Sequence, residues 1–437
     1  MTKNKKLIKI ALALSFLAII LIISQKNSPT PIRKNYQINS YTHQILLPAK
    51  IVKNDNLEKY SFLTGNYYGH KVKIYLAKPL EKIQNHYLLT LPNLKDGQYH
   101  LGSNITLTIG YQNYPTINSI KVCQGKNENL NCFASYFINQ YILNNNLRAT
   151  LTEVKERKDT TPGLANYCHL VLHQLGIYYI IKGGQLGNFD SAYVALCDNG
   201  FIHGAQEGLS IALSTPELFH TLPKICTSSS ILSTIGNCDH GLGHLAYWRT
   251  GNFSDAINLC LALEPPHPNT QNTNSLINCT DGVAMSYLSD YQASKANPLP
   301  INSYEIPLKV KNPISLCLSL KDFFAATGCL SDINFFYQAQ DTLILKNGCD
   351  KLTPLQQSYC YISLGRLSGN YYPYTYTGKI CNTTNKDALN RCLAQGVAWN
   401  YFMYKGNPDY TSNYCREYST LPATCAFLKE REKNFTV

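Results

Sequence analysis

The chain has 437 residues, of which 44% are hydrophobic, and a formal net charge of +12. A chain of this length can hold two or three domains and bury a large core, so its size does not limit its stability. Seven of the 39 Lys and Arg residues lie in the first 35 positions, which hold no acidic residue, so the rest carries 32 basic and 27 acidic side chains. A net charge of +5, without a basic stripe interleaved with aromatic residues, excludes nucleic acid as an expected partner.

Residues 1–35 predict an export signal that also anchors the chain in a membrane as a transmembrane helix. The apolar run 7–23 follows Lys3, Lys5 and Lys6 and includes Lys9 near its start, and its 17 residues reach the short end of the range for a membrane-spanning helix. Ile22 would stand three positions before a cut after Ser24, where a small residue is needed, so an uncleaved signal-anchor is favoured over a cleaved signal. With the basic end inside, the body lies outside the cytoplasm, in the periplasm or the extracellular space.

Residues 36–122 alternate between apolar and polar side chains in short segments, which predicts a small β-rich domain. The clearest predicted strands are residues 71–76, 87–91 and 104–109. Proline and glycine residues stand between these segments, as expected for turns.

Residues 123–163 predict one helix followed by a linker. Apolar side chains recur at helical spacing from Cys132 onwards, as at Phe133, Phe137 and Tyr141. The stretch 144–163 is polar, and we expect it to loop out before the regular part of the chain begins.

Residues 164–437 repeat a unit that contains a fixed pair of cysteines. Residues 187–197 and 251–260 both begin with Gly-Asn-Phe and end with Leu-Cys. Cysteines that close such a segment recur at positions 226, 260, 317, 349, 381 and 415, and cysteines that open the next helix at 238, 279, 329, 360, 392 and 425. Apart from one longer step before Cys317, the closing cysteines recur every 32 to 34 residues, which is typical of stacked two-helix units. The predicted fold class is therefore mainly α, a disulfide-stapled αα-repeat solenoid preceded by the small β-rich domain.

One unit shows the predicted order of elements best. Residues 238–248 and 253–263 are its two helices, joined by a turn at 249–252. The longer step corresponds to residues 265–313, which are rich in Pro and Asn and predict an insertion that projects from the array as a long loop.

The unit resembles Sel1-like and tetratricopeptide-type αα repeats in its period and in the run Ala-Tyr-Trp-x-x-Gly-Asn-Phe-x-x-Ala at 246–256. The resemblance covers about residues 165–430. It implies an α-solenoid architecture and no particular activity. The full tetratricopeptide signature is absent, and the regular cysteine pair is an addition.

Sixteen cysteines in an exported chain without any CxxC motif predict eight disulfide bonds. Within the units, the expected bonds join the cysteine that closes one helix to the cysteine that opens the next: 226–238, 260–279, 317–329, 349–360, 381–392 and 415–425. By the same logic Cys123 pairs with Cys132. Cys168 and Cys197 are left to pair with each other, although Cys197 both closes one helix and opens the next.

Five of the eleven histidines lie within 76 residues, each shortly after an opening cysteine. They form three runs, which are His169 with His173, His203 with Glu207, and His240 with His244. In each run two side chains of the ligand type lie four residues apart, on one face of a helix, with Cβ atoms about 5–6 Å apart. Equivalent helices of neighbouring units pack about 8–10 Å apart, so the three pairs can face one space. The pattern predicts a metal site formed by the five histidines.

The later units indicate that the repeat itself does not require histidine. His203 and His244 lie six residues after their opening cysteines, and the same offset gives Met285, Phe335, Arg366 and Ala398. Small residues that leave room for close approach lie among the histidines, at Gly200, Gly204, Gly241 and Gly243. The helix dipole near an N-terminus disfavours imidazolium, which keeps His169 and His240 neutral and available as ligands. The alternative is structural, since a single buried histidine is more often a hydrogen-bonded core residue than a ligand.

Imidazole groups together with one carboxylate suit Zn, Cu or Fe. Glu207 is the candidate catalytic base beside a metal-bound water, with a metal ligand or a surface residue as alternatives. Asp198 and Asp239, each directly after a cysteine, are candidates for orienting imidazoles or for capping helices. The chain contains no GxSxG, HExxH or P-loop motif, so an activity would be metal-dependent oxidation or hydrolysis.

A second hypothesis is a non-enzymatic scaffold whose solenoid groove binds an envelope protein or a polysaccharide, with structural histidines. Aromatic residues gather in the second half of the array, at Tyr371, Tyr372, Tyr374, Tyr376, Trp399, Tyr401, Phe402 and Tyr404. Such side chains pack between repeats and are also favoured at binding surfaces. Replacing His203 and His244 separates the hypotheses, because it abolishes metal binding under the first and changes only stability under the second.

Overall fold

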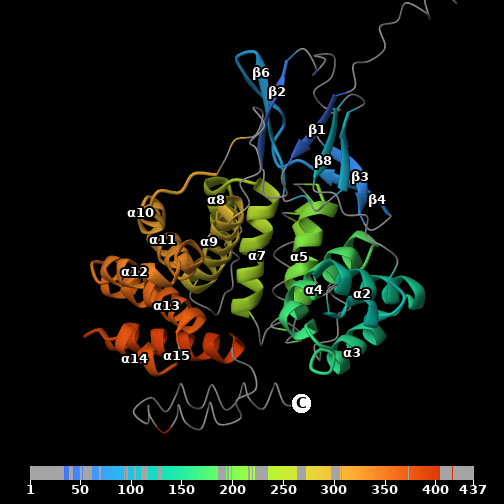
Figure 1. The fold of residues 1–437 in the computed structure, drawn as a ribbon. Helices are drawn as coiled ribbons and strands as arrows, with labels where there is room; N and C mark the ends of the chain where they lie inside the picture. Colours follow the sequence, from blue (N-terminus) through green and yellow to red (C-terminus); the bar gives the residue numbers. More distant parts are fainter. Residues whose placement is uncertain are drawn as a thin grey trace, which may run out of the picture.

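The computed structural model describes most of residues 34–403. It leaves out residues 1–33, the chain after residue 403 except Arg416, and several loop segments, the longest being 53–61, 222–234, 263–271 and 297–305. The described part is mainly helical, with a smaller β-rich region above the helices in Figure 1. In this part of the chain no helix is long and apolar enough to cross a membrane, and the predicted spanning run 7–23 lies outside it.

The β-rich region contains two sheets. Its strands are β1 (Lys34–Ile38), β2 (Gln44–Pro48), β3 (Phe62–Tyr67), β4 (His70–Tyr75), β5 (Glu81–Ile83), β6 (His86–Thr90), β7 (Gly97–Leu101) and β8 (Ile105–Ile109). One sheet has the order β1-β8-β7-β3-β4, with β1 and β8 parallel, and the other has the antiparallel order β2-β6-β5. The strands predicted from the alternating segments are confirmed as β4, β6 and β8. They bury Ile74, Leu89 and Leu107, whose side chains belong to the core.

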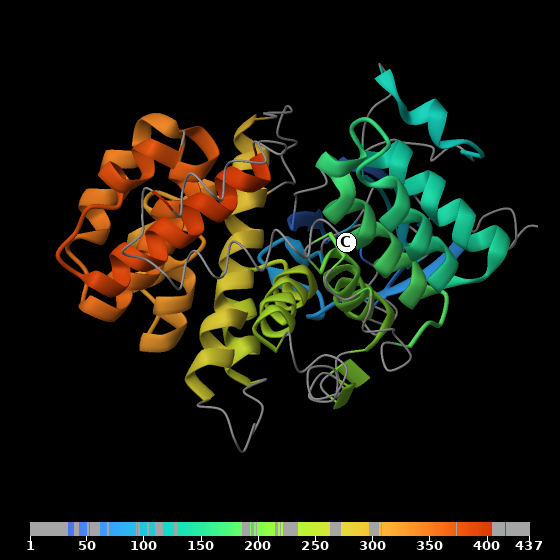
Figure 2. The same cartoon turned by 90° about the horizontal axis from the view of Figure 1, so that it is seen from below.

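The helices pack side by side in chain order. A row of inner helices comprises α4 (Leu164–Ile181), α5 (Gly200–Ala212), α7 (Ile235–Thr250), α9 (Asn272–Ala296), α11 (Phe323–Leu330), α13 (Pro354–Tyr371) and α15 (Lys386–Met403), each packed against the next. The other helices are α2 (Leu130–Asn144), α3 (Leu147–Arg157), α8 (Phe253–Ala262), α10 (Pro313–Leu318), α12 (Thr342–Cys349) and α14 (Tyr374–Ile380). Short 3-10 helices lie at Ile120–Cys123, Ile333–Phe336 and Ala339–Asp341. Seen from below in Figure 2, the colours run across the molecule from green to red, which confirms a repeat-like packing of helices.

The stretch predicted as a linker, 144–163, is not a loop, because it contains α3. Asn146 caps this helix and accepts a hydrogen bond of 3.0 Å from the backbone N–H of Ala149. Leu151 and Val154, one helical turn apart, are buried. The prediction was wrong because a few buried residues are enough to dock so short a helix, although Lys155 and Glu156 are exposed.

The predicted insertion 265–313 is also not one long loop. It contains α9, which packs between α7 and α11 as a member of the inner row. Leu276, Val283 and Tyr287 recur at helical spacing and are buried. Every proline of this segment lies before or after α9. The prediction was wrong because the proline-rich ends of the segment were taken as representative of all its residues.

Six of the predicted disulfide bonds are confirmed. They are Cys123–Cys132, Cys168–Cys197, Cys260–Cys279, Cys317–Cys329, Cys349–Cys360 and Cys381–Cys392. Their Cα atoms are 5.4 to 5.9 Å apart, which is usual for disulfides. Cys238 is disulfide-bonded too, whereas Cys226, Cys415 and Cys425 lie outside the described residues. Within the part of the chain that the structure describes, no cysteine is free.

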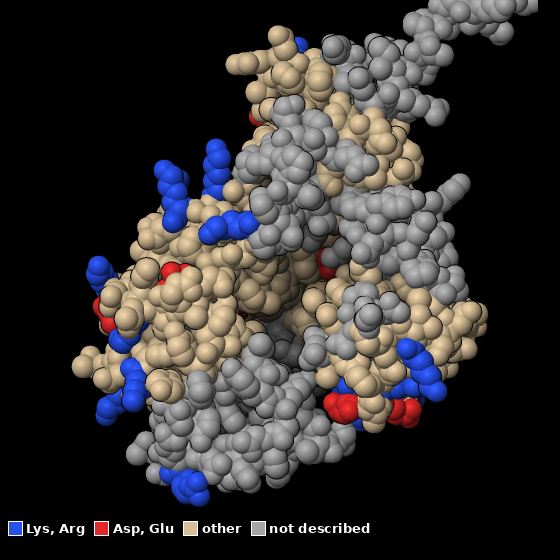
Figure 3. Space-filling view, viewed as in Figure 1, with Lys and Arg blue, Asp and Glu red and all other residues tan. Residues whose placement is uncertain are grey.

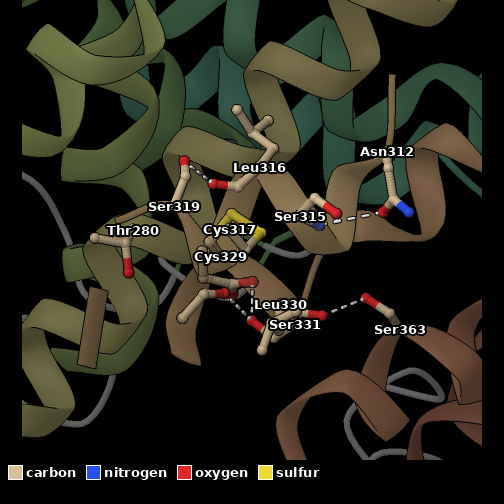
Figure 4. The surroundings of a disulfide bond; sticks show 12 residues. Thr280, Asn312, Ser315, Leu316, Cys317, Ser319, Cys329, Leu330, Ser331 and Ser363 are labelled. Atoms are coloured by element: carbon tan, nitrogen blue, oxygen red, sulfur yellow. Dashed lines mark hydrogen bonds between the residues drawn. A yellow bond between two sulfur atoms is a disulfide. The ribbon is translucent and has the colours of Figure 1, made fainter. Parts of the chain in front are cut away.

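Figure 4 shows how one of these bonds joins successive helices. Cys317 in α10 and Cys329 in α11 are both fully buried. Next to the bond, the hydroxyl of Ser363 in α13 donates a hydrogen bond of 2.9 Å to the backbone carbonyl of Leu330. The disulfide and this hydrogen bond therefore tie three helices together at one place.

Replacing both Cys317 and Cys329 with Ser is expected to lower the free energy of unfolding by about 3 kcal/mol, the loop-entropy value for a short loop. Their sequence separation is 12 residues. Urea denaturation of the oxidised protein measures the change. Ser363→Ala serves as a control at the same place, with an expected loss of about 1 kcal/mol for one hydrogen bond. A double serine variant as stable as the parent would contradict a stabilising role of the cysteine pair.

Two buried polar contacts fix the β-rich region to the helices. Arg249, in the last turn of α7, donates hydrogen bonds to the carbonyls of Tyr75 at 2.8 Å and Ser210 at 2.9 Å. His43, which directly precedes β2, is hydrogen-bonded through Nε2 to Asp290 in α9 at 2.7 Å. The β-rich region thus braces α5, α7 and α9, and α5 and α7 carry three of the predicted ligands.

Candidate metal centre

Glycines allow the helices of the predicted site to touch backbone to backbone. A Cβ atom at Gly204 in α5 would collide with the Cα and carbonyl oxygen of His173 in α4, and one at Gly243 in α7 with the carbonyl of Cys279 in α9. Only glycine permits such an approach, because a backbone atom cannot rotate away. Between these pairs, the buried side chain of Gln206 donates a hydrogen bond of 3.1 Å to the carbonyl of Cys238, which fixes α5 against α7.

The five histidines predicted as ligands form one continuous cluster. The ring centroids of His169 and His173 are 4.7 Å apart, and each lies 5.6 Å from His203. His203 in turn lies 5.7 Å from both His240 and His244, whose rings are 4.5 Å apart. The fold therefore brings together side chains from three helices, as the spacing predicted.

The cluster is deep but can be reached from the surface. His173, His203 and His244 are buried, whereas His169 and His240 are partly exposed. Figure 3 shows a hollow near the centre of the molecule, in the part of the view where Figure 1 places the lower end of α7. His240 belongs to the first half of α7, which begins at that lower end.

Three of the histidines have the separation that ligands of one ion require. His169, His173 and His203 each place one ring nitrogen within 4.8 Å of the others. The Nε2 atoms of His169 and His173 are 3.1 Å apart. Two nitrogen ligands at about 2.05 Å from one ion are this far apart when the angle at the ion is about 98°, between the octahedral and the tetrahedral value.

Three histidines are hydrogen-bonded at Nδ1 and a fourth, His173, faces a carboxylate there, so Nε2 of each is left for the cluster. The partners are the Cys197 carbonyl for His169 at 2.9 Å, Glu207 Oε2 for His173 at 3.5 Å, Asp281 Oδ2 for His240 at 3.1 Å and Ser286 Oγ for His244 at 2.5 Å. A carbonyl oxygen only accepts, so Nδ1 of His169 carries the proton and its Nε2 has the free lone pair. Metal-binding histidines are usually held in this way by an acceptor at the other ring nitrogen.

Without a metal ion, the contact between His169 and His173 is a hydrogen bond of 3.1 Å between their Nε2 atoms. Because Nδ1 of His169 carries the proton of that ring, Nε2–H of His173 is the donor, and the Nδ1 lone pair of His173 then faces Glu207 Oε2 at 3.5 Å. That arrangement is unfavourable when Glu207 is ionised. A metal ion bound to both Nε2 atoms would instead leave a proton on Nδ1 of His173, toward the carboxylate.

Charges around the other two histidines are arranged differently. Burial holds the pKa of His244 well below its usual value, and the neighbouring His240 and His203 add to this effect, so the ring is neutral at pH 7. Burial raises the pKa of Asp281, but the hydrogen bond from His240 and the charges of His240 and Arg366 outweigh it, so the pKa lies below its usual value. Asp281 is therefore ionised.

Of the three carboxylates singled out in the sequence, the structure describes Glu207 and Asp239. Glu207, the candidate base, is buried and faces Nδ1 of His173, the position of a carboxylate that orients a ligand. Its role as a base stays a prediction. Asp239 is buried in the first turns of α7, and Asp198 lies outside the described residues.

Two further residues of the centre, Asp281 and Asp332, were not predicted. Each places one carboxylate oxygen within 4.8 Å of a ring nitrogen of His240 and of the other oxygen. Asp281 lies two residues after Cys279, as His240 lies two residues after Cys238. Comparing aspartate and glutamate as well as histidine at equivalent positions of the units would therefore have identified Asp281. Asp332 lies beyond the end of α11 and has no such signal.

No protein-family model matches the chain, and it has no significant match among curated proteins or solved structures. The resemblance to Sel1-like and tetratricopeptide-type repeats therefore stays a prediction, and the geometry of the centre is the basis for a proposed function.

Proposed function

We propose that this protein binds a transition-metal ion through the histidines of α4, α5 and α7. His169, His173 and His203 are the ligands, and Glu207 orients His173. The observation that carries the proposal is that His169, His173 and His203 place ring nitrogens within 4.8 Å of one another, with the Nε2 atoms of His169 and His173 3.1 Å apart. Nitrogen ligands suit Zn, Cu or Fe, and thiolates take no part because the described cysteines are in disulfides.

The chemistry of such a site follows from its open coordination positions. Three imidazole ligands leave room for a water molecule or a substrate, as in catalytic zinc sites with three protein ligands. A metal ion of this kind makes bound water a nucleophile at neutral pH, which supports hydrolysis, while Cu or Fe would support oxidation. His240 and His244 extend the cluster beyond His203 toward the carboxylates.

The test is the metal content of the full-length protein, made under oxidising conditions and dialysed against a weak chelator. We expect the parent to retain Zn, Cu or Fe and the variant His173→Ala/His203→Ala to lose one equivalent while remaining folded by circular dichroism. His86→Ala in β6 is the matched control, because this histidine is exposed and remote from the cluster in sequence and fold. A folded double variant with the metal content of the parent would overturn the proposal.

The proposal includes the architecture and the location of the protein. The row of inner helices is an α-solenoid of disulfide-stapled αα repeats, and the run 7–23 anchors it in the membrane with the body outside the cytoplasm. The disulfide bonds support this location, because such bonds persist in oxidising compartments.

A second candidate function is a scaffold that binds an envelope protein or a polysaccharide. Exposed apolar and aromatic side chains in the C-terminal half favour it, among them Leu343, Ile344, Tyr371 and Tyr376. Under this alternative the histidines are structural, and His173→Ala/His203→Ala changes stability without changing metal content.

A further inference from the structure

A second set of ligand-type atoms lies next to the three-histidine site. One ring nitrogen of His240 and one carboxylate oxygen each from Asp281 and Asp332 lie within 4.8 Å of one another. They come from α7, from α9 and from the residue pair that follows α11, three successive members of the inner row. The side chains are 17%, 14% and 0% exposed, so the group is shielded but reachable.

Hydrogen bonds and ion pairs within the described part of the protein leave one carboxylate oxygen of this group unsatisfied. His240 Nδ1 lies 3.1 Å from one oxygen of Asp281, and Ser331 donates to the other. Arg366 is ion-paired with Oδ1 of Asp332. Oδ2 of Asp332 is buried and has no hydrogen-bond partner among the described residues. A buried carboxylate oxygen without a donor is costly, so its presence indicates a cationic ligand.

The charge count points the same way. Two carboxylates face one guanidinium, so one negative charge remains within the group when His240 is neutral. Besides Oδ1 of Asp332, the guanidinium of Arg366 contacts the Ser331 carbonyl, to which it donates at 3.2 Å, and lies 5.7 Å from the centre of the Trp399 ring. The guanidinium therefore pairs with Oδ1 of Asp332, and Oδ2 of the same carboxylate remains available to another cation.

We propose that His240, Asp281 and Asp332 bind a second, harder divalent cation of the Mn²⁺ type, so that the protein contains a two-metal centre. This inference rests on the proposed function, to which it adds a second ion. Carboxylate ligands suit Mn²⁺, whereas the three imidazoles of the first site suit Zn²⁺ or Cu²⁺. His203 of the first set of ligands and His240 of the second have ring centroids 5.7 Å apart, so the two sets adjoin.

The experiment measures Mn²⁺ and Zn²⁺ binding to the metal-free, full-length protein, by electron paramagnetic resonance for Mn²⁺ and by calorimetry for Zn²⁺. We expect Asp281→Asn/Asp332→Asn to weaken Mn²⁺ binding about 100-fold and to leave Zn²⁺ binding unchanged. His173→Ala/His203→Ala should do the reverse. Circular dichroism establishes that each variant is folded.

Arg366→Gln keeps the test decisive if the aspartate variant does not fold. Removing this positive charge should tighten Mn²⁺ binding about tenfold, because the guanidinium repels a cation at the same carboxylate. If Asp281 and Asp332 only form a structural ion-pair network, Arg366→Gln changes stability without changing Mn²⁺ affinity. That result would overturn the second site.

The outcomes separate this inference from the proposed function. If the parent binds no Mn²⁺, or if the aspartate variant binds it as tightly as the parent, the second site is refuted. The first site then still stands, provided that Zn²⁺ binding depends on His173 and His203. If Mn²⁺ binding depends on the aspartates while Zn²⁺ binding ignores His173 and His203, the proposed first site fails and the second stands.

Discussion

Gly204→Ala is expected to lower the free energy of unfolding by about 3 kcal/mol and to weaken metal binding at the three-histidine site about 10- to 100-fold. The added methyl group would collide with the Cα and carbonyl oxygen of His173. These are backbone atoms, so the collision is relieved only when α5 moves away from α4. That movement separates His203 from His169 and His173. Urea denaturation and Zn²⁺ calorimetry on the same preparations measure both effects.

Gly348→Ala in α12 is the matched control. Its new methyl group would meet only the tip of the Ile314 side chain, which can rotate away. Alanine has the better helix propensity, so this variant should be neutral or more stable by up to about 1 kcal/mol. If Gly204→Ala were as stable as Gly348→Ala and bound Zn²⁺ normally, α4 and α5 would not approach each other as closely as the structure shows.

Features that depend on local spacing could be predicted from the sequence. The strand at 104–109 alternates with a period of two, and this pattern survives in any fold that buries one face. The cysteine pairs 349–360 and 381–392 are each separated by 11 residues, so a short connection between two helices brings them together regardless of the rest of the chain. In contrast, α3 and α9 were missed because composition was given more weight than the spacing of a few apolar residues.

The same distinction applies to the candidate site. The histidines could be recognised because they share offsets within a repeated unit, so the repeat itself places them on neighbouring helices. Asp332 could not, since it lies beyond the end of α11 and reaches His240 only through tertiary packing. Glu207 was recognised as a candidate, but its orientation toward Nδ1 of His173 depends on how α4 packs on α5.

Zinc added to the metal-free protein is expected to raise the free energy of unfolding by about 4 kcal/mol when the free ion is about a thousandfold above its dissociation constant. The ligands His169, His173 and His203 come from two separate helices, α4 and α5, so the unfolded chain does not present them together. Disulfides also prevent the described cysteines from binding zinc in the unfolded state. Urea denaturation at two zinc concentrations measures the gain directly.

The dependence of this gain on pH and on the ligands identifies its source. Protons compete with the metal for imidazole, whose usual pKa is about 6.5, so the gain should be full at pH 7.5 and should shrink as the pH falls toward 5. It should vanish in His173→Ala/His203→Ala and persist in His86→Ala. If zinc still raised the free energy of unfolding of the double variant, it would be binding at another site, because that variant lacks two of the three proposed ligands. Loss of the gain in that variant alone would instead show that metal binding and the packing of these helices are energetically coupled.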